Sequence, residues 1–294
     1  MIPRVRFGRT GVEVTRLALG GYPFGGVNRA RNWDPFTQRG RSQAIETVHA
    51  ALDAGINLID TAPGYGDGNS EAIIGEALAG RREDVFVATK VGYQGTAVDV
   101  QESVEASLRR LQTEYVDLLQ FHGGMYTDTQ VNHILEQGLL AMLIRLRDEG
   151  RVRFIGFTVE EPWTAKPLIA SGAFDVMQVR YNLIYQAAAL HVLDEARQAD
   201  MGVSVMRPMT SGILQHLMRK LAPEVEDAVD LYEISLKFVL SDSRVHVANV
   251  GMRWPEEVEK NVALVSSFEP EYDVADLPRM TAHVYERQDQ AADV

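Results

Sequence analysis

Residues 55–71 read GINLIDTAPGYGDGNSE, and this stretch decides the fold. It opens with a short apolar run that is bounded by glycine and proline, a pattern typical of a buried strand. The strand ends in a carboxylate, Asp60, and a glycine-rich loop that carries Tyr65 follows it. A buried strand that ends in an ionisable group beside such a loop indicates a functional site.

The same pattern recurs twice further along the chain. Residues 84–90 (DVFVATK) form an apolar run that ends in Lys90, and residues 117–122 (DLLQFH) form another that ends in His122. The steps from Asp60 to Lys90 and from Lys90 to His122 are 30 and 32 residues, about the length of one strand–helix–strand unit. Because consecutive parallel strands point the same way, we expect these three side chains at one rim of the sheet.

Strands and helices alternate over the whole chain, which predicts an α/β fold, a (β/α)8 TIM barrel with an N-terminal β-hairpin. The predicted barrel strands are residues 17–19, 56–59, 84–90, 117–122, 152–157, 174–179, 203–206 and 245–250. Residues 1–16 form the predicted hairpin, which would close the bottom of the barrel, and residues 269–294 form a predicted C-terminal tail. No linker interrupts the pattern, so we expect one domain over residues 1–294. A doubly wound open sheet is the alternative, but its usual glycine-rich phosphate fingerprint after the first strand is missing.

Helix start and stop signals predict several boundaries. Ser42 is the expected N-cap of a helix that ends at Gly55. One helix is expected over about residues 132–149, and another over about residues 224–240.

The composition of the 294 residues excludes several classes of function. A net charge of −12 argues against a nucleic-acid partner, and no apolar run approaches the length of a membrane span. The chain has no cysteine, which excludes disulfides, thiol chemistry and cysteine-bound metals. The histidines have no metal-ligand spacing with a carboxylate, so we expect no metal site. The N-terminus has no signal-peptide pattern, so the cytoplasm is the expected location.

Asp60, Tyr65, Lys90 and His122 together suit the reduction of a carbonyl group. A nearby ammonium favours the phenolate form of a tyrosine and lowers its pKa from the usual value of about 10. The carboxylate would keep the lysine charged, and the imidazole could hydrogen-bond a carbonyl oxygen. The set therefore places a proton donor at an oxygen that becomes anionic during hydride addition. Each residue alone could be structural, as a loop cap, an ion-pair partner, a loop tyrosine or a rim histidine.

A second signal follows the eighth predicted strand. Gly251 and Arg253 precede Pro255, which fits the first turn of a helix. A glycine, an arginine and a helix N-terminus favour an anion site, and this loop is the usual phosphate position in barrels. The alternative is a simple turn with a surface charge.

With these residues in place, the chain resembles the aldo-keto reductase superfamily from about residue 4 to residue 268. The motifs FGRTGVEVTRLALGG, AGINLIDTAPGYGDGNSEAIIGEAL, SLRRLQTEYVDLLQFH, RDEGRVRFIGF, MQVRYNL and NVGMRWPEEVEKN fall in the order of that family. The resemblance implies a barrel that binds NADP(H) without a doubly wound sheet and reduces aldehydes or ketones.

The resemblance also implies roles for individual residues. Tyr65 would donate the proton, Lys90 and Asp60 would tune its acidity, and His122 would orient the substrate carbonyl. Tyr22, with Tyr65 and His122, would line the substrate pocket. The implied cofactor-binding residues are Gly20, Gly21, Asp60, Thr158, Gln178, Met206, Arg207, Pro208, Ser211, Gly251, Arg253, Glu257 and Asn261.

The chain departs from the family at three of these places. Thr158 and Val159 replace the frequent Ser-Asn pair, so an amide contact to the cofactor carboxamide is lost. Met206 stands where an aromatic ring usually covers the nicotinamide, and a thioether can also cover a ring face. Glu257 stands near the expected 2′-phosphate, which leaves Arg253 as its main partner, so NADP(H) is expected and NAD(H) stays open.

Two other functions remain open at this point. The barrel could be an NADP(H)-binding redox sensor or auxiliary subunit with little turnover. It could also be an aldolase in which Lys90 forms a Schiff base with its substrate. The sequence leaves the physiological substrate, the direction of reaction and the oligomeric state open.

Overall fold

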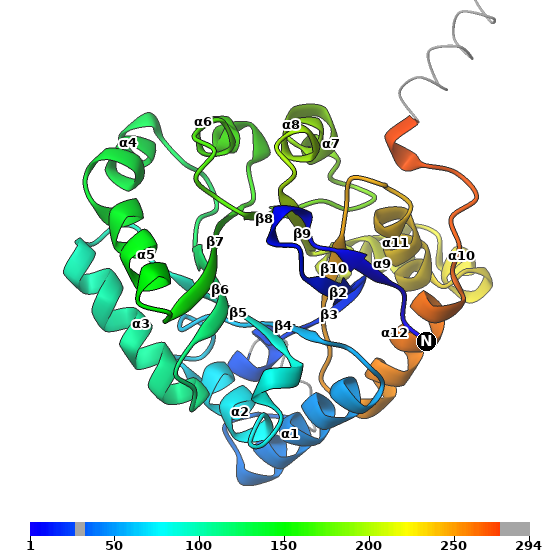
Figure 1. The fold of residues 1–294 in the computed structure, drawn as a ribbon. Coiled ribbons are helices and arrows are strands. Elements are labelled where there is room, and N and C mark those ends of the chain that lie inside the picture. The colour runs from blue at the N-terminus through cyan, green and yellow to red at the C-terminus, as the bar shows by residue number, and fades with distance from the viewer. Residues whose placement is uncertain (27–32, 277–294) are drawn as a thin grey trace, which may run out of the picture.

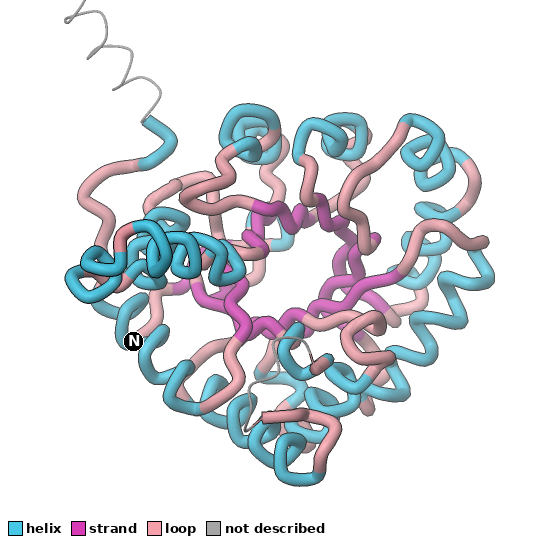
Figure 2. The backbone as a smooth tube through the Cα atoms, turned by 180° about the vertical axis from the view of Figure 1, so that it is seen from behind, coloured by secondary structure: helices cyan, strands magenta, loops and turns pink. Residues whose placement is uncertain are grey.

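The computed structural model describes residues 1–26 and 33–276. Within them, eight parallel strands close into a barrel in the order β10-β3-β4-β5-β6-β7-β8-β9, so the predicted fold is confirmed. The helices surround this ring of strands (Figure 1, Figure 2). The strands are β3 (Leu17–Gly20), β4 (Leu58–Asp60), β5 (Phe86–Val91), β6 (Val116–Phe121), β7 (Val152–Val159), β8 (Val176–Arg180), β9 (Gly202–Met206) and β10 (Val247–Gly251).

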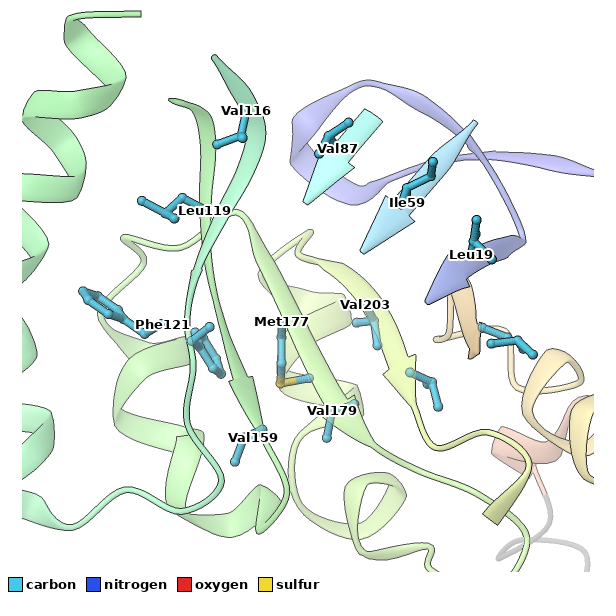
Figure 3. Close-up of a cluster of buried hydrophobic side chains, with 14 of the residues drawn as sticks. Leu19, Ile59, Val87, Val116, Leu119, Phe121, Val159, Met177, Val179 and Val203 are labelled. Atoms are coloured by element: carbon cyan, nitrogen blue, oxygen red, sulfur yellow. The ribbon is translucent and has the colours of Figure 1, made fainter. Parts of the chain in front are cut away.

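Side chains alternate along each strand between the outer helices and the barrel interior. Leu19, Ile59 and Val203 belong to the large cluster that the surrounding helices share (Figure 3). Leu58 and Val247 point to the opposite face of their strands and belong to a separate cluster. This second cluster fills the N-terminal half of the barrel interior.

The predicted N-terminal hairpin is confirmed and closes that end of the barrel (Figure 1). Strands β1 (Arg4–Arg6) and β2 (Glu13–Thr15) pair antiparallel. Between them Phe7 is fully buried, and its ring meets those of Phe86 and His246 edge to face at 5.9 and 6.0 Å. The hairpin therefore contributes a core side chain to the interior.

The helices alternate with the strands. They are α1 (Gln38–Asp53), α2 (Asn69–Ala77), α3 (Ala97–Leu111), α4 (Asp128–Glu136), α5 (Leu139–Asp148), α6 (Lys166–Ala170), α7 (Ala187–His191), α8 (Leu193–Gln198), α9 (Ile213–Leu221), α10 (Pro223–Ala228), α11 (Leu231–Leu240) and α12 (Pro255–Ser267). None of the helices in the described part of the chain is long and apolar enough to cross a membrane.

Three predicted helix boundaries are wrong. Helix α1 begins before Ser42 because the side chain of Thr37 caps it, accepting a hydrogen bond from the Gly40 N–H. The helix expected over residues 132–149 is two helices, because Gly138 takes a φ of 97° between them.

The helix expected over residues 224–240 is also interrupted. Asp230 caps α11 by accepting hydrogen bonds from the backbone N–H groups of Tyr232 and Glu233. Helix α9 lies before this region and was not predicted. Of the predicted tail, only the part up to Asp276 lies within the described residues, and it contains the 3₁₀ turn Val274–Asp276.

Candidate active site

The structure brings the four predicted residues together at the C-terminal rim of the barrel. Asp60 is the last residue of β4, Lys90 lies near the end of β5, and His122 directly follows β6. The Lys90 ammonium donates hydrogen bonds to the Asp60 carboxylate at 2.6 Å, to the Tyr65 hydroxyl at 3.1 Å and to the Thr61 carbonyl at 2.8 Å. All three donor positions of the ammonium are therefore used, which fixes its place.

Aromatic contacts fix the Tyr65 side chain. Its ring meets Tyr22 edge to face at 5.0 Å and His122 at 5.9 Å. The loop that carries it packs tightly against the turn after β3, because a Cβ on Gly66 would lie 2.7 Å from the Gly25 carbonyl oxygen. Gly66 also has a φ of 66°, so the loop requires glycine there. The hydroxyl accepts a hydrogen bond from Lys90 while the ring contacts Tyr22 and His122.

Burial and charge act on Tyr65 in opposite directions. Burial raises the pKa of Tyr65, and the Lys90 ammonium lowers it by less, so the net shift is upward. The sequence-based expectation of a lowered pKa for Tyr65 is therefore wrong. Burial would lower the pKa of Lys90, but Asp60 and Tyr65 outweigh it and raise that pKa. At neutral pH the Tyr65 phenol is accordingly neutral and the Lys90 ammonium is charged.

His122 is exposed at the mouth. Packing of its ring and then the charge of Lys90 lower the pKa of His122, and Asp60 and Glu160 oppose the shift. An imidazole with a lowered pKa is neutral at pH 7. It can donate one hydrogen bond to an oxygen beside Tyr65.

The second oxygen of Asp60 is held by two amides. Gln178 donates to Asp60 Oδ1 at 2.9 Å, and Gln120 donates to the same atom at 3.3 Å. Gln178, expected to hold the cofactor carboxamide, thus holds the carboxylate in this structure. Gln120 was not predicted, although the alternation of Leu118, Gln120 and His122 along β6 places it inside the barrel.

The segment after β9 forms part of an ion-pair network at the mouth. The Arg207 guanidinium donates to Glu160 at 2.8 Å and to the Ser211 hydroxyl at 3.2 Å. Met206 precedes it and is half-buried, while Pro208 is buried. Arg207 and Ser211 both have positive φ, so this segment makes a tight turn over the rim.

Thr158 is buried at the end of β7, but its hydroxyl is already used. It donates to the Gly123 carbonyl at 2.8 Å and accepts from the Gly123 N–H at 3.0 Å. Val159, the next residue, is fully buried and apolar. The end of β7 therefore offers few free polar groups to a ligand.

Close backbone contacts join the ends of β10, β3 and β4. Gly251 pairs with Gly20, and Gly20 pairs with Asp60. The Gly21 N–H donates to the Asp60 carbonyl at 2.7 Å, and a Cβ on Gly21 would lie 2.6 Å from the Ser70 hydroxyl. These predicted cofactor residues thus line the rim beside the buried carboxylate.

In the predicted anion-binding segment after β10, the arginine is already paired with a carboxylate of the same segment. Glu257 accepts from the backbone N–H of Arg253 at 2.6 Å and from its guanidinium at 2.8 Å. The guanidinium lies 4.3 Å from the centroid of the Trp254 ring, and Asn261 donates to the Glu257 carbonyl at 2.8 Å. The carboxylate reduces the positive field that a phosphate would meet here.

Buried polar atoms inside the barrel fit a ligand with polar groups. Among the described residues, Ser204 Oγ and Asn249 Oδ1 are buried and have no hydrogen-bond partner. They lie on β9 and β10, the strands whose ends carry Arg207 and Arg253. Unpartnered buried polar atoms are rare in native proteins and usually meet a ligand or water.

This combination of a closed parallel barrel and a buried tyrosine–lysine–aspartate set at its C-terminal rim defines a barrel oxidoreductase. The family model of the aldo/keto reductase family matches residues 16–283, so the chain belongs to that family. "Aldo-keto reductase YhdN" of Bacillus subtilis (strain 168) is 34% identical over 219 residues, which are 70% of this chain and 61% of that protein. This chain thus spans less than two thirds of the length of that relative.

Two further proteins are similar to this chain, one in sequence and one in fold. The "NADH-specific methylglyoxal reductase" of Escherichia coli (strain K12) is 32% identical over 231 residues, covering 72% of this chain and 68% of that protein. A crystal structure of an aldo-keto reductase from Klebsiella pneumoniae in complex with NADPH superimposes with a TM-score of 0.77 at 24% identity, covering 95% of each chain. The latter supports the fold.

Proposed function

We propose that this protein reduces an aldehyde or ketone to an alcohol with NADP(H), with Tyr65 as the proton donor. One observation carries the proposal. The Lys90 ammonium donates hydrogen bonds to the Asp60 carboxylate and the Tyr65 hydroxyl at once, and Lys90 is only 1% exposed. A buried cation at a phenol oxygen stabilises the phenolate that remains after proton transfer.

A nicotinamide cofactor held at the rim would supply a hydride for the carbonyl carbon. The electron pair of the C=O bond then moves to oxygen, which takes the proton of the Tyr65 hydroxyl. His122, neutral at pH 7, donates a hydrogen bond to the same oxygen. Lys90 stabilises the Tyr65 phenolate until solvent returns a proton.

Asp60 acts through Lys90. With one oxygen on the ammonium and the other on Gln120 and Gln178, the carboxylate keeps Lys90 charged in a buried position. An isolated ammonium in such a buried site would lose its proton, so Lys90 needs the Asp60 carboxylate beside it. The two amides contribute because they hold that carboxylate in place.

The residues that would hold the cofactor are those of the rim. Gly20, Gly21 and Gly251 lie side by side at this rim, while Arg207 and Arg253 would supply positive charge for the phosphates of the cofactor. The E. coli relative is NADH-specific by name, and Glu257 pairs with Arg253 here. The experiment that tests the reaction therefore compares NADPH with NADH. We also propose a small-molecule carbonyl substrate, one domain over residues 1–294 and a cytoplasmic location.

The test is oxidation of NADPH, and separately NADH, by the purified protein with a panel of aldehydes that includes methylglyoxal. Tyr65→Phe should lower turnover by a factor of about 10² to 10⁴ while NADPH binding, followed by fluorescence, stays within about twofold. Tyr115→Phe is the matched control, because Tyr115 directly precedes β6 at the opposite end of that strand from His122, and it should retain turnover within about threefold. Full turnover in Tyr65→Phe would exclude Tyr65 as the donor.

The aldolase alternative requires a neutral Lys90. Its raised pKa and its bond to Asp60 weigh against a nucleophilic amine. Borohydride treatment with a carbonyl substrate should leave Lys90 unmodified, and mass spectrometry of the peptide that contains it checks this. Tight NADPH binding without turnover over the panel would instead support the sensor alternative.

A further inference from the structure

Three buried carboxylates lie outside the candidate site in the part of the chain that the structure describes. They are Glu71 on α2, Asp117 on β6 and Asp242 after α11. An isolated charge is costly to bury, and each of the three is accordingly paired with an arginine. Glu71 differs from the other two in its place, because it lies between the segments that carry Tyr65 and Lys90.

One oxygen of Glu71 holds the strand that carries Lys90. The Thr89 hydroxyl donates a hydrogen bond to Glu71 Oε1 at 2.6 Å, and both residues are fully buried. Thr89 directly precedes Lys90 on β5. Because side chains alternate along a strand, Thr89 faces the outer helices while Lys90 faces the barrel interior. Glu71 therefore fixes the outer face of β5 at the position next to the ammonium.

The other oxygen of Glu71 acts on the Tyr65 loop through Arg110. The guanidinium places Nε at 2.7 Å and Nη2 at 2.6 Å from Glu71 Oε2. The Arg110 side chain lies against the backbone of the loop, since a Cβ on Gly68 would stand 2.5 Å from Arg110 Nε. The start of α2 also bonds the loop, because the Ser70 N–H donates to the Tyr65 carbonyl at 3.2 Å. Glu71 and its arginine thus keep the loop against α2.

The contact that depends on this network is the hydrogen bond from Lys90 to Tyr65. At 3.1 Å it is the longest of the three bonds that the ammonium donates. The two residues come from a strand and a loop, so their distance depends on what joins these segments. A shift of about 0.5 Å would lengthen the bond beyond the usual range. Misplacement of reacting groups by about 1 Å can lower a rate by as much as 10²-fold.

We propose that Glu71, held by Thr89 and Arg110, is a positioning residue for proton transfer from Tyr65. The inference rests on the proposed function, since Glu71 has a part in the reaction only where Tyr65 donates the proton. Glu71 acts on the Lys90 strand through Thr89 and on the Tyr65 loop through Arg110. It thereby sets the distance between the phenol and the ammonium from outside the barrel.

The main test is the variant Glu71→Gln in the full chain. The amide oxygen can still accept from Thr89, but the amide N–H₂ group would face the Arg110 guanidinium, and two donors cannot bond each other. The Arg110 side chain is 30% exposed, so it can turn into solvent and release the loop. The single-turnover rate of cofactor oxidation at saturating aldehyde should fall about tenfold. The dissociation constant of the cofactor, and the aldehyde concentration that gives half the maximal rate, should stay within about twofold.

Asp117→Asn is the matched control. Asp117 is 1% exposed and accepts hydrogen bonds from Arg82 at 2.8 Å and from Arg153 at 2.6 Å. It lies at the start of β6, at the opposite end of that strand from His122. This variant also removes a buried charge from its arginines, so the free energy of unfolding should fall in both variants. The single-turnover rate of Asp117→Asn should match the parent within about twofold.

Thr89→Val provides a second variant in case Glu71→Gln does not fold. Valine is close to threonine in shape, and the pair of Glu71 and Arg110 stays intact. Only the bond that joins α2 to β5 is lost. The single-turnover rate should therefore fall by a smaller factor, about threefold, again without a change in cofactor affinity.

Hydrogen exchange gives a readout that needs no turnover. Exchange in the peptide that covers residues 61–70, followed by mass spectrometry, should be faster in Glu71→Gln than in the parent and unchanged in Asp117→Asn. Parent-like exchange and turnover in Glu71→Gln would overturn the proposal. Faster exchange with parent-like turnover would also overturn it, because the position of the loop would then not limit the reaction.

Two further outcomes separate the proposal from its alternatives. An equal loss of turnover in Asp117→Asn would overturn it by assigning the effect to general instability. Failure of the proposed function is distinguishable, because the parent protein would then oxidise neither NADPH nor NADH, or Tyr65→Phe would keep full turnover. Neither of these results depends on Glu71.

Discussion

The two ends of the barrel interior are built from opposite kinds of side chain on the same strands. On β4 the inward face changes from Leu58 to Asp60, and on β5 it changes from Phe86 to Lys90. The N-terminal end is an apolar plug completed by Phe7, whereas the C-terminal end is a hydrogen-bonded ionic set. The difference predicts that changes at one end alter stability alone, and changes at the other alter chemistry.

Lys90→Met should have the largest effect, because it breaks a buried ion pair. It leaves the Asp60 carboxylate buried at 2% exposure without its cation. We expect a loss of about 3–5 kcal/mol in the free energy of unfolding, together with loss of turnover. Urea unfolding and the aldehyde assay measure the two effects.

The double variant Asp60→Asn with Lys90→Met then separates stability from chemistry. The asparagine oxygen can still accept from Gln120 and Gln178, and no charge remains buried. Most of the stability should return while turnover does not. Recovery of turnover in this double variant would show that the ion pair is only structural.

Phe7→Ala tests the other end of the barrel. Phe7 is fully buried, and Gly202 makes room for it, since a Cβ on Gly202 would lie 2.8 Å from its ring. We expect a loss of about 3 kcal/mol in the free energy of unfolding from the cavity left behind. Turnover and NADPH affinity at a temperature where the variant is folded should match the parent. A change in NADPH affinity of tenfold or more would show that the two ends are coupled.

The strands and the placement of the candidate site residues could be predicted because short-range patterns determine them. Short apolar runs bounded by turn residues mark β4, β5 and β6, and the strand ends then place Asp60, Lys90 and His122 at one rim. Gln120 could have been predicted by the same alternation. The pairing of Arg253 with Glu257 could also have been predicted, because residues four apart on a helix lie on one face.

The features that could not be predicted depend on packing, burial and distances in the folded structure. Gly138 fits a helical pattern, and only the packing around it makes it break the helix. The sequence indicates that Lys90 lies near Tyr65, but the net direction of the Tyr65 pKa depends on how far burial outweighs that charge. Likewise, which inward polar groups are occupied, as in Thr158 and Gln178, depends on distances that spacing alone does not determine.

The smallest predicted effect on stability comes from His246, and it depends on pH. It lies at the plugged end, where its ring contacts Phe7 and its Nδ1 accepts a hydrogen bond from the Val203 N–H at 3.1 Å. Burial first, and then the charges of Arg16 and Arg6, lower the pKa of His246 to about 4, with Asp200 opposing them. The neutral form is therefore the one that packs in the folded state.

Because the folded-state pKa lies below the unfolded value of about 6.5, the unfolded chain binds a proton first as the pH falls. The contribution of His246 to stability is therefore complete above about pH 6.5 and is lost between about pH 6.5 and 4. His246→Gln keeps an acceptor for the Val203 N–H and removes the titration. From pH 7 to pH 5 the parent should lose about 2 kcal/mol more unfolding free energy than this variant in urea titrations. Equal losses in both proteins would show that the acid sensitivity of the fold comes from elsewhere, and a change in NADPH affinity in the variant would contradict the separation of the two ends.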